Sequence, residues 1–308
     1  MIRKYILTFL FLAFVSFTYS QKIDSIKYEF GHLYYRTYGH GETVVILSGG
    51  PGSNVLQEES VALALAKSYK VILLEQRGTG LSIPTKLDTS TITLKAAIND
   101  INLLLAHLKL SKTILLGHSW GGSLAMIYAS QFPEKVKSLV LVAPGYFGMG
   151  WSMYSLCVDN LMSKLGKQEN ERLLEIFAKE DNGGISADET EEKRRLFRLP
   201  YLFDKSMYDS LKQIIYRGFN EKTFQLMLYN AMQYDFSLKT DLQKIKSPIH
   251  IICGRQDIFT YVTYELKIAR PSIKVYWIDK SGHFPMYEQP EIFYPQLSQI
   301  MQKAKNYR

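Results

Sequence analysis

The residues of this 308-residue chain best suited to chemistry form the segment Gly117-His118-Ser119-Trp120-Gly121-Gly122. An apolar run typical of a β-strand, 112–116, precedes it, and an Ala- and Leu-rich segment with helical spacing, 123–131, follows it. A G-x-S-x-G match alone recurs in unrelated chains, but a strand before it and a helix after it favour a nucleophile elbow. In such an elbow a strained backbone presents the serine hydroxyl above the edge of a sheet. The pattern predicts that Ser119 is a nucleophile.

A serine hydroxyl needs a base to take its proton and an acid to orient that base. In a chain with this type of elbow the order is serine, then acid, then histidine. His283 lies in a loop between the apolar run 274–278 and the last helical segment, and we predict that it is the base. Asp257 directly follows the strand-like run 248–253 and is the predicted acid. Asp279 is nearer to His283 in the chain, a position typical of a local turn or cap.

The other five histidines fit this role less well. His250 lies inside a strand-like run and is expected in the core, and His118 occupies the variable position of the elbow, where packing is expected. His32, His40 and His107 precede the nucleophile, which is the wrong order.

The tetrahedral oxyanion of acyl transfer needs two preorganised donors. The backbone N–H of Trp120, the residue after the nucleophile, is one candidate. Gly50, in the loop Gly49-Gly50-Pro51-Gly52 after the apolar run 43–47, is placed to supply the other. The chain has no metal-ligand cluster, phosphate loop or dinucleotide fingerprint, so we expect no metal and no cofactor.

Strands and helices alternate along most of the chain. The expected strands are 23–30, 32–38, 43–47, 70–74, 112–116, 138–143, 248–253 and 274–278, and the expected helices are 58–68, 94–108, 123–131, 264–269 and 291–303. Apolar strands separated by helices predict an α/β fold with a mostly parallel sheet covered on both faces, and the first two strands predict an antiparallel hairpin at its edge.

The alternation stops at Pro144 and resumes near Pro248. Between them, residues 145–245 are helical in character and rich in Tyr, Phe and Met. Ligands bind at the carboxyl ends of the strands in open α/β sheets. We therefore expect 145–245 to be a helical cap over that edge, inserted into a discontinuous core of residues 21–144 and 246–308.

Residues 1–20 differ from the rest of the chain. Arg3 and Lys4 precede a short apolar run, 5–17, and a polar stretch follows, which is the pattern of a secretory signal peptide. The run is shorter than the roughly 20 residues of a membrane span, so we expect an exported protein, periplasmic or secreted, with no stable membrane span after leader removal. The net charge of +8 is dispersed and accompanies no nucleic-acid-binding module, so we expect no nucleic-acid partner.

Taken together, these motifs resemble the α/β-hydrolase superfamily and, within it, the proline iminopeptidase branch. The matching segments are 49–52, Gln76-Arg77-Gly78-Thr79-Gly80-Leu81-Ser82, 119–122, Gly254-Arg255-Gln256-Asp257 and 282–283. The resemblance implies Ser119, His283 and Asp257 as the catalytic groups and release of an N-terminal residue, typically proline, from small peptides.

The chain departs from the branch at three places. Ser48 stands where the family has the histidine of H-G-G-P-G, and Glu75 stands where it has the aspartate of D-Q-R-G. The segment 229–236 lacks the glutamate with which the branch binds the substrate ammonium. Asp235 or Glu221 could replace it, and Trp151 could contribute to an aromatic substrate site.

Two further functions stay open beside the aminopeptidase. A carboxylesterase or lactonase acting on small acyl esters would use the same catalytic groups, and an aromatic cap suits an apolar acyl group as well as a proline ring. A non-catalytic ligand-binding relative is the third possibility, disfavoured because every catalytic element is in place. The expected partner is a small peptide or ester.

Overall fold

The computed structural model describes residues 21–146, 151–234, 238 and 240–307, and the side chains of 151–154 are outside that description. The predicted leader, 1–20, therefore lies outside the described residues. The described part contains eight strands: β1 (Lys22–Tyr28), β2 (Gly31–Tyr38), β3 (Thr43–Leu47), β4 (Lys70–Leu74), β5 (Thr113–His118), β6 (Val136–Val142), β7 (Ile249–Gly254) and β8 (Lys274–Ile278).

The strands form one sheet in the order β1-β2-β4-β3-β5-β6-β7-β8. β1 pairs antiparallel with β2, and β2 pairs antiparallel with β4, whereas the pairs from β4 to β8 are parallel. Every residue of β5 and of β7 is buried, as continuous apolar runs predict for strands covered on both faces. The predicted α/β-hydrolase fold, with its mostly parallel sheet and antiparallel edge hairpin, is confirmed.

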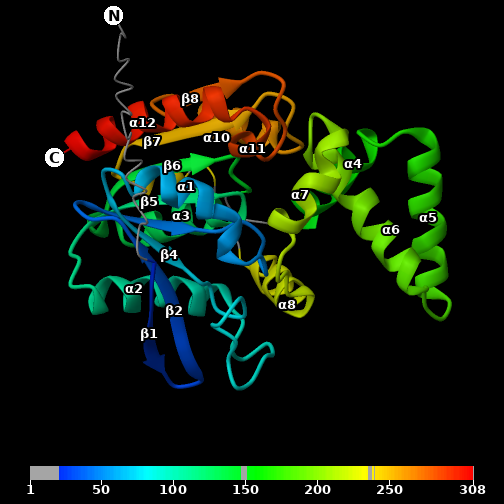
Figure 1. Ribbon diagram of the computed structural model, residues 1–308, viewed down its shortest axis with the longest axis horizontal. Helices are drawn as coiled ribbons and strands as arrows, with labels where there is room; N and C mark the ends of the chain where they lie inside the picture. The colour runs from blue at the N-terminus through cyan, green and yellow to red at the C-terminus, as the bar shows by residue number, and fades with distance from the viewer. Residues whose placement is uncertain (1–20, 147–150, 235–237, 239, 308) are drawn as a thin grey trace, which may run out of the picture.

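Seven helices of the described chain belong to the sheet region: α1 (Glu59–Leu65), α2 (Leu94–His107), α3 (Trp120–Gln131), α9 (Asp241–Lys244), α10 (Thr260–Ala269), α11 (Pro285–Glu288) and α12 (Pro290–Asn306). α1 and α12 cover one face of the sheet, and α2, α3 and α10 cover the other; Figure 1 labels these helices around the sheet. Leu115 of β5 packs in one buried cluster with α2, α3 and α10, while its neighbours Ile114 and Leu116 pack in a second cluster with α1 and α12. Alternate residues of a strand thus supply the two layers of the core.

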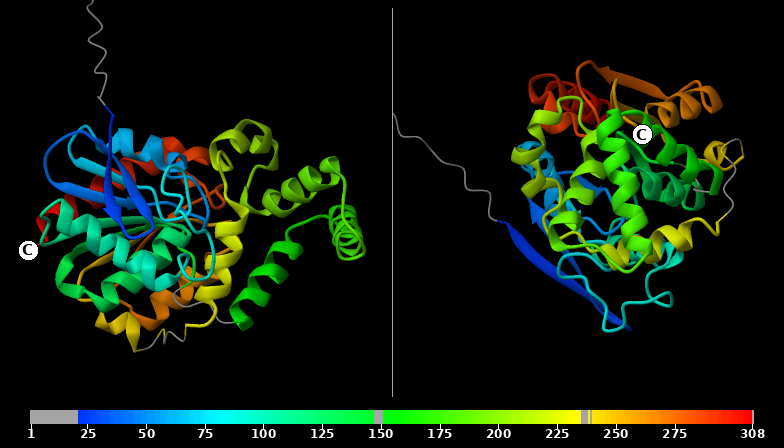
Figure 2. Two further views of the ribbon diagram at one scale, coloured as in Figure 1. Left: turned by 90° about the horizontal axis from the view of Figure 1, so that it is seen from below. Right: turned by 90° about the vertical axis from the view of Figure 1, so that its right-hand side faces the viewer.

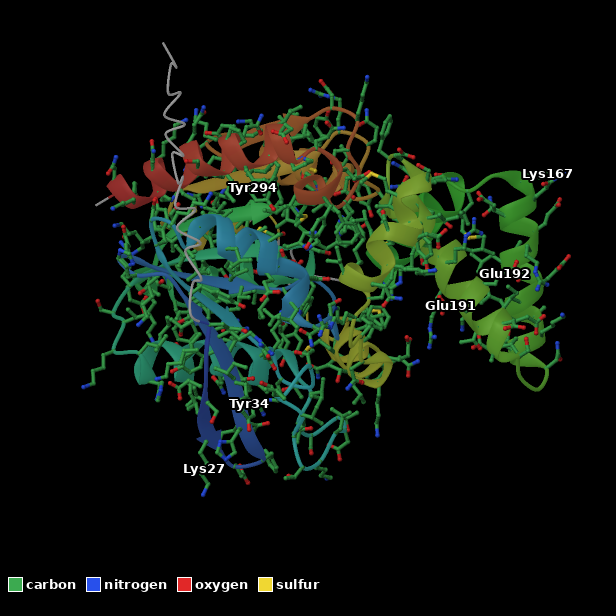
Figure 3. All side chains as sticks on the ribbon, viewed as in Figure 1. Lys27, Tyr34, Lys167, Glu191, Glu192 and Tyr294 are labelled. Carbon is green, nitrogen blue, oxygen red and sulfur yellow. The ribbon has the colours of Figure 1, made fainter. Side chains whose placement is uncertain are left out.

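Besides the short helix α9, five α-helices of the described chain lie between β6 and β7: α4 (Trp151–Ser163), α5 (Lys167–Asp181), α6 (Ala187–Arg198), α7 (Tyr208–Ile215) and α8 (Glu221–Ala231). Figures 1 and 2 show α4 to α7 beyond one end of the sheet, with the paired helices α5 and α6 farthest out. Lys167, Glu191 and Glu192 project from these outer helices (Figure 3). The pair is tied together by charge, since Arg172 Nη2 lies 2.8 Å from Glu192 Oε2.

Two helices begin earlier than the sequence pattern indicates. α3 begins at Trp120, not at 123. Its first turn contains Gly121 and Gly122, and glycine has a low helix propensity, so the sequence pattern does not indicate a helix there. α10 begins at Thr260, not at 264.

No helix within the described residues is long and apolar enough to cross a membrane. Cys157 and Cys253 are both free thiols.

The parallel strands bring distant segments to one edge of the sheet. The loop with Gly50 follows the carboxyl end of β3, Ser119 follows β5, Asp257 follows β7 and His283 follows β8. Because parallel strands end on the same side, these segments meet there although they are far apart in sequence.

Candidate active site

Ser119 occupies the strained turn between β5 and α3. Its backbone has φ 51° and ψ −119°, a conformation that residues other than glycine rarely adopt. Backbone hydrogen bonds hold the turn, among them one from Ser119 N to Val142 O at 3.0 Å and one from Gly145 N to Ser119 O at 2.9 Å. The surrounding structure therefore fixes the strained conformation, as in a nucleophile elbow.

The glycines on either side of Ser119 are required by close backbone approaches. A Cβ on Gly117 would lie 2.3 Å from the carbonyl oxygen of Gly121, and a Cβ on Gly121 would lie 2.1 Å from that of Leu47. Neither position has room for a side chain. The G-x-S-x-G spacing is thus explained by the contact of α3 with β3 and β5.

His283 and Asp257 form the hydrogen-bonded pair that the sequence predicts. His283 Nδ1 lies 3.0 Å from both carboxylate oxygens of Asp257, and both side chains are buried. Asp257 Oδ1 also accepts a hydrogen bond from the backbone N–H of Phe259 at 3.0 Å. With Nδ1 donating its proton to the carboxylate, Nε2 is the ring nitrogen left to accept a proton.

The environment of His283 keeps the imidazole neutral. Burial lowers the pKa of His283 from its usual 6.5, and this effect outweighs the opposite influence of the Asp257 carboxylate. Aromatic rings produce this burial, with the ring centroids of Tyr201, Phe259 and Phe284 lying 5.1, 5.2 and 5.3 Å from that of His283. A neutral imidazole at neutral pH is the form that a general base requires.

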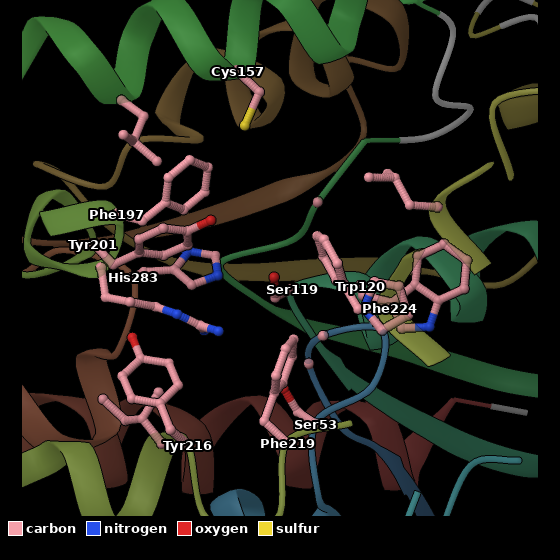
Figure 4. A pocket seen from close by; sticks show the side chains of 18 of the residues that line it. Ser53, Ser119, Trp120, Cys157, Phe197, Tyr201, Tyr216, Phe219, Phe224 and His283 are labelled. Atoms are coloured by element: carbon pink, nitrogen blue, oxygen red, sulfur yellow. The ribbon is translucent and has the colours of Figure 1, made fainter. Parts of the chain in front are cut away.

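Ser119 and His283 line the same cavity of about 280 Å³. Figure 4 shows both side chains at its wall, with Phe197, Phe219 and Phe224 around them. His283 Nε2 is buried and has no hydrogen-bond partner within the described residues. An unpaired buried nitrogen is unusual in a folded protein and is typical of a catalytic group. The site thus brings together the predicted nucleophile, base and acid.

The predicted oxyanion donors border the same cavity. Gly50 has φ 111° in the loop after β3, and Trp120 is the first residue of α3. The first N–H groups of a helix have no partner inside it, so the amide of Trp120 is available to a ligand. Gly50 and Trp120 therefore line the same cavity as Ser119, and their role as oxyanion donors stays a prediction.

Gln76 connects these two loops, a role that its motif alone does not reveal. Its Nε2 donates hydrogen bonds to Ser48 O at 2.9 Å and to Ser48 Oγ at 3.1 Å, and its Oε1 accepts one from Trp120 Nε1 at 3.0 Å. A single buried amide thus fixes the loop of Gly50 against the start of α3. Ser48, which departs from the family histidine, takes part in this network.

His118 forms hydrogen bonds as well as packing in the core, and the sequence pattern did not predict these hydrogen bonds. Its Nδ1 lies 2.8 Å from Glu58 Oε1 and its Nε2 lies 3.0 Å from the carbonyl oxygen of His283, with both His118 and Glu58 fully buried. Burial opposes the charge on His118, but the Glu58 carboxylate outweighs it and raises the pKa of the imidazole. A protonated His118 donates at both nitrogens, so it binds Glu58 and supports the backbone of His283.

Glu288 joins the helical region to the loop of His283. Its Oε2 accepts a hydrogen bond from Gly282 N at 2.7 Å, and its Oε1 accepts one from Phe203 N at 2.6 Å. A third contact runs from His283 N to the carbonyl oxygen of Tyr201 at 2.7 Å. The segment before α7 is therefore fastened directly to the histidine loop.

The three candidate substrate-binding residues have different outcomes. Glu221, the first residue of α8, lines the cavity. Trp151 begins α4, but its side chain is outside the described part. Asp235 lies outside the described residues altogether. The aromatic lining comes instead from residues such as Phe197, Tyr201 and Tyr216.

No group of three or more His, Cys, Asp or Glu side chains within the described residues is arranged to hold a metal ion.

This site has a serine on a strained turn and a histidine paired with a buried aspartate, and backbone amides lie at the carboxyl ends of a mostly parallel sheet. These features define the class of α/β-fold hydrolases. The family model described as alpha/beta hydrolase fold matches residues 42–290, and the chain belongs to this family. It is a hydrolase, as the sequence motifs predict.

The chain is similar to one curated relative and to two solved structures that share its fold. A proline iminopeptidase from Heyndrickxia coagulans is 27% identical over 267 residues, which cover 82% of this chain and 88% of that protein. The structure of a proline iminopeptidase-related protein from Thermus thermophilus has a TM-score of 0.69 at 19% identity and covers 92% of this chain and 98% of its own. Naproxen esterase from Bacillus subtilis has a TM-score of 0.62 at 16% identity, with 92% of each chain covered. The resemblance to the proline iminopeptidase branch is confirmed.

Proposed function

We propose that this protein is a serine hydrolase that releases an N-terminal proline from small peptides through an acyl-enzyme. The observation that carries the proposal is the pairing of His283 with Asp257, which leaves Nε2 unpartnered in the cavity that Ser119 also lines. The likeness to proline iminopeptidases over most of the chain supports the choice of substrate.

In this mechanism Ser119 Oγ attacks the carbonyl carbon of the proline residue while His283 Nε2 takes the hydroxyl proton. A C–O bond forms, and the N–H groups of Gly50 and Trp120 stabilise the oxyanion. When the intermediate collapses, the C–N bond breaks and the imidazolium gives its proton to the departing amine. Water, deprotonated by His283, then hydrolyses the ester and releases proline.

The substrate ammonium needs a carboxylate. Glu221 is the one carboxylate side chain among the described residues that line the cavity. We assign the ammonium to Glu221 and expect Glu221→Gln to raise KM for proline 4-nitroanilide about tenfold, because a charge-assisted hydrogen bond is lost. KM for a neutral ester should stay unchanged. An equal effect on both substrates would contradict this assignment.

An esterase is the second candidate, and the aromatic lining of the cavity favours it, since such a surface accepts an apolar acyl group. The test compares proline 4-nitroanilide with 4-nitrophenyl butyrate, using Ser119→Ala as the background. Turnover of the anilide above that background supports the aminopeptidase. Turnover of the ester alone would replace it with the esterase, and turnover of neither would reject both in favour of a ligand-binding relative.

We also propose that the protein acts outside the cytoplasm, on the strength of the basic and then apolar pattern of residues 1–20. N-terminal sequencing of the protein from fractionated cells tests this. A mature chain starting near residue 21 in the exported fraction is expected, and an intact leader in the cytoplasm would contradict the proposal.

A further inference from the structure

The cavity beside Ser119 contains a cation that the proposed reaction does not use. Arg198, the last residue of α6, lines this cavity together with Lys193 and Arg194 of the same helix. Among its described residues, the lining therefore includes three cationic side chains and one carboxylate, that of Glu221. An excess of positive charge in the lining would not help to bind a substrate whose only charge is positive.

Lys193 and Arg194 each have a carboxylate partner outside the cavity lining. Lys193 Nζ lies 2.6 Å from Glu180 Oε1, and Arg194 Nη1 lies 3.5 Å from Glu191 Oε2. Arg198, in contrast, forms no ion pair with any carboxylate that the structure describes. It is also half-buried, so bulk water screens its charge less than that of an exposed arginine.

Aromatic rings hold the guanidinium of Arg198 in place. Its Cζ lies 3.8 Å from the ring centroid of Tyr216 and 4.7 Å from that of Phe219. Figure 4 shows these two rings on one side of the cavity that contains Ser119 and His283. Stacking occupies the faces of a planar guanidinium and leaves N–H groups at its edge able to donate. Such a fork fits a carboxylate with two parallel hydrogen bonds.

We propose that Arg198 binds the C-terminal carboxylate of the substrate, so that the preferred substrates are dipeptides with a free C-terminus. This inference rests on the proposed peptidase function and specifies its substrate class. A dipeptide carries an ammonium at one end and a carboxylate at the other. Glu221 and Arg198 supply the two opposite charges in one cavity, which matches that pattern.

The test is the ratio of kcat/KM for prolyl-alanine to that for prolyl-alaninamide, which differ in the terminal charge. We expect the wild-type protein to favour the free carboxylate at least tenfold, about 1.4 kcal/mol. In Arg198→Gln the ratio should fall to within about twofold of one. Arg195→Gln, a matched loss of one charge at an exposed position of the same helix outside the cavity lining, should keep the wild-type ratio, and Arg198→Lys should be intermediate. Thermal unfolding of each variant verifies that it is folded.

Failure of this inference differs from failure of the proposed function. Hydrolysis of both peptides with a ratio near one, or a preference that persists in Arg198→Gln, would overturn the role of Arg198 and leave the peptidase intact. If neither peptide is hydrolysed, the dipeptide assignment is overturned. A second pair, 4-nitrophenyl hydrogen glutarate and its methyl ester, then measures whether Arg198 binds a carboxylate in an esterase.

Discussion

At the scale of single residues, the account depends on a neutral His283 whose Nε2 accepts a proton. Its pKa is lowered by burial among Tyr201, Phe259 and Phe284, more than the Asp257 carboxylate raises it. The base works while unprotonated, so activity is present above the pKa of His283 and lost as pH falls through it. The direction of the shift places this loss below pH 6.5.

We therefore predict that kcat/KM for a neutral ester, measured from about pH 4.5 to 8, falls on the acid side with a midpoint below 6.5. Asp257→Asn removes the group that raises the pKa, so it should move the midpoint further down and reduce kcat by roughly 10³–10⁴. A wild-type midpoint above 6.5 would contradict the assigned environment of the base.

The buried pair of His118 and Glu58 gives a second prediction at this scale. Removing one partner leaves an uncompensated charge in the interior, so His118→Leu should lower the free energy of unfolding by about 3–5 kcal/mol. The double variant Glu58→Leu and His118→Leu should recover part of that loss, because no unpaired charge remains. Chemical denaturation of the four proteins measures the cycle. Additive losses would show that the two side chains are not coupled.

At the scale of elements, the sequence predicted what periodicity and glycine spacing can express. The apolar runs 43–47, 70–74 and 274–278 are strands with those bounds. The contact of His118 with Glu58, 60 residues earlier in the chain, could not be predicted, because no local pattern links a residue of the elbow to one before α1. For the same reason, the sequence could not predict which face of α6 lines the cavity.

Glu288 connects the segment before α7 to the loop of His283, and its removal should make both segments more mobile. Glu288→Ala leaves the N–H groups of Gly282 and Phe203 without their acceptor, and at the buried Gly282 an unpaired N–H costs about 1–3 kcal/mol. We expect faster hydrogen exchange at 201–204 and 281–283 and a lower kcat. Glu291→Ala, an exposed glutamate on α12, is the matched control and should change neither. Unaltered exchange in Glu288→Ala would show that the helical region is held elsewhere.

At the scale of the whole molecule, the site exists because a parallel sheet collects the ends of distant strands. The elbow pattern around Ser119 and the chain order of serine, acid and histidine predicted the three residues, because the topology dictates where strand ends meet. The structure pairs His283 with Asp257 and places Ser119 and His283 in the lining of one cavity.

The groups that we propose for substrate binding were harder to predict, because the sequence offered Glu221 only as one of two carboxylates and did not single out Arg198. Arg198 lies on α6 and Glu221 on α8, and a helix such as α8 is held by tertiary contacts, among them the hydrogen bond from Thr223 Oγ1 to Gly78 O at 2.8 Å.

The most direct test of the central claim is covalent labelling with a fluorophosphonate, followed by mass spectrometry of the digested protein. One adduct on the peptide that contains Ser119 is expected, absent in Ser119→Ala and at least a hundredfold slower to form in His283→Ala. An adduct on another residue, or labelling that persists in Ser119→Ala, would contradict the assignment of the nucleophile.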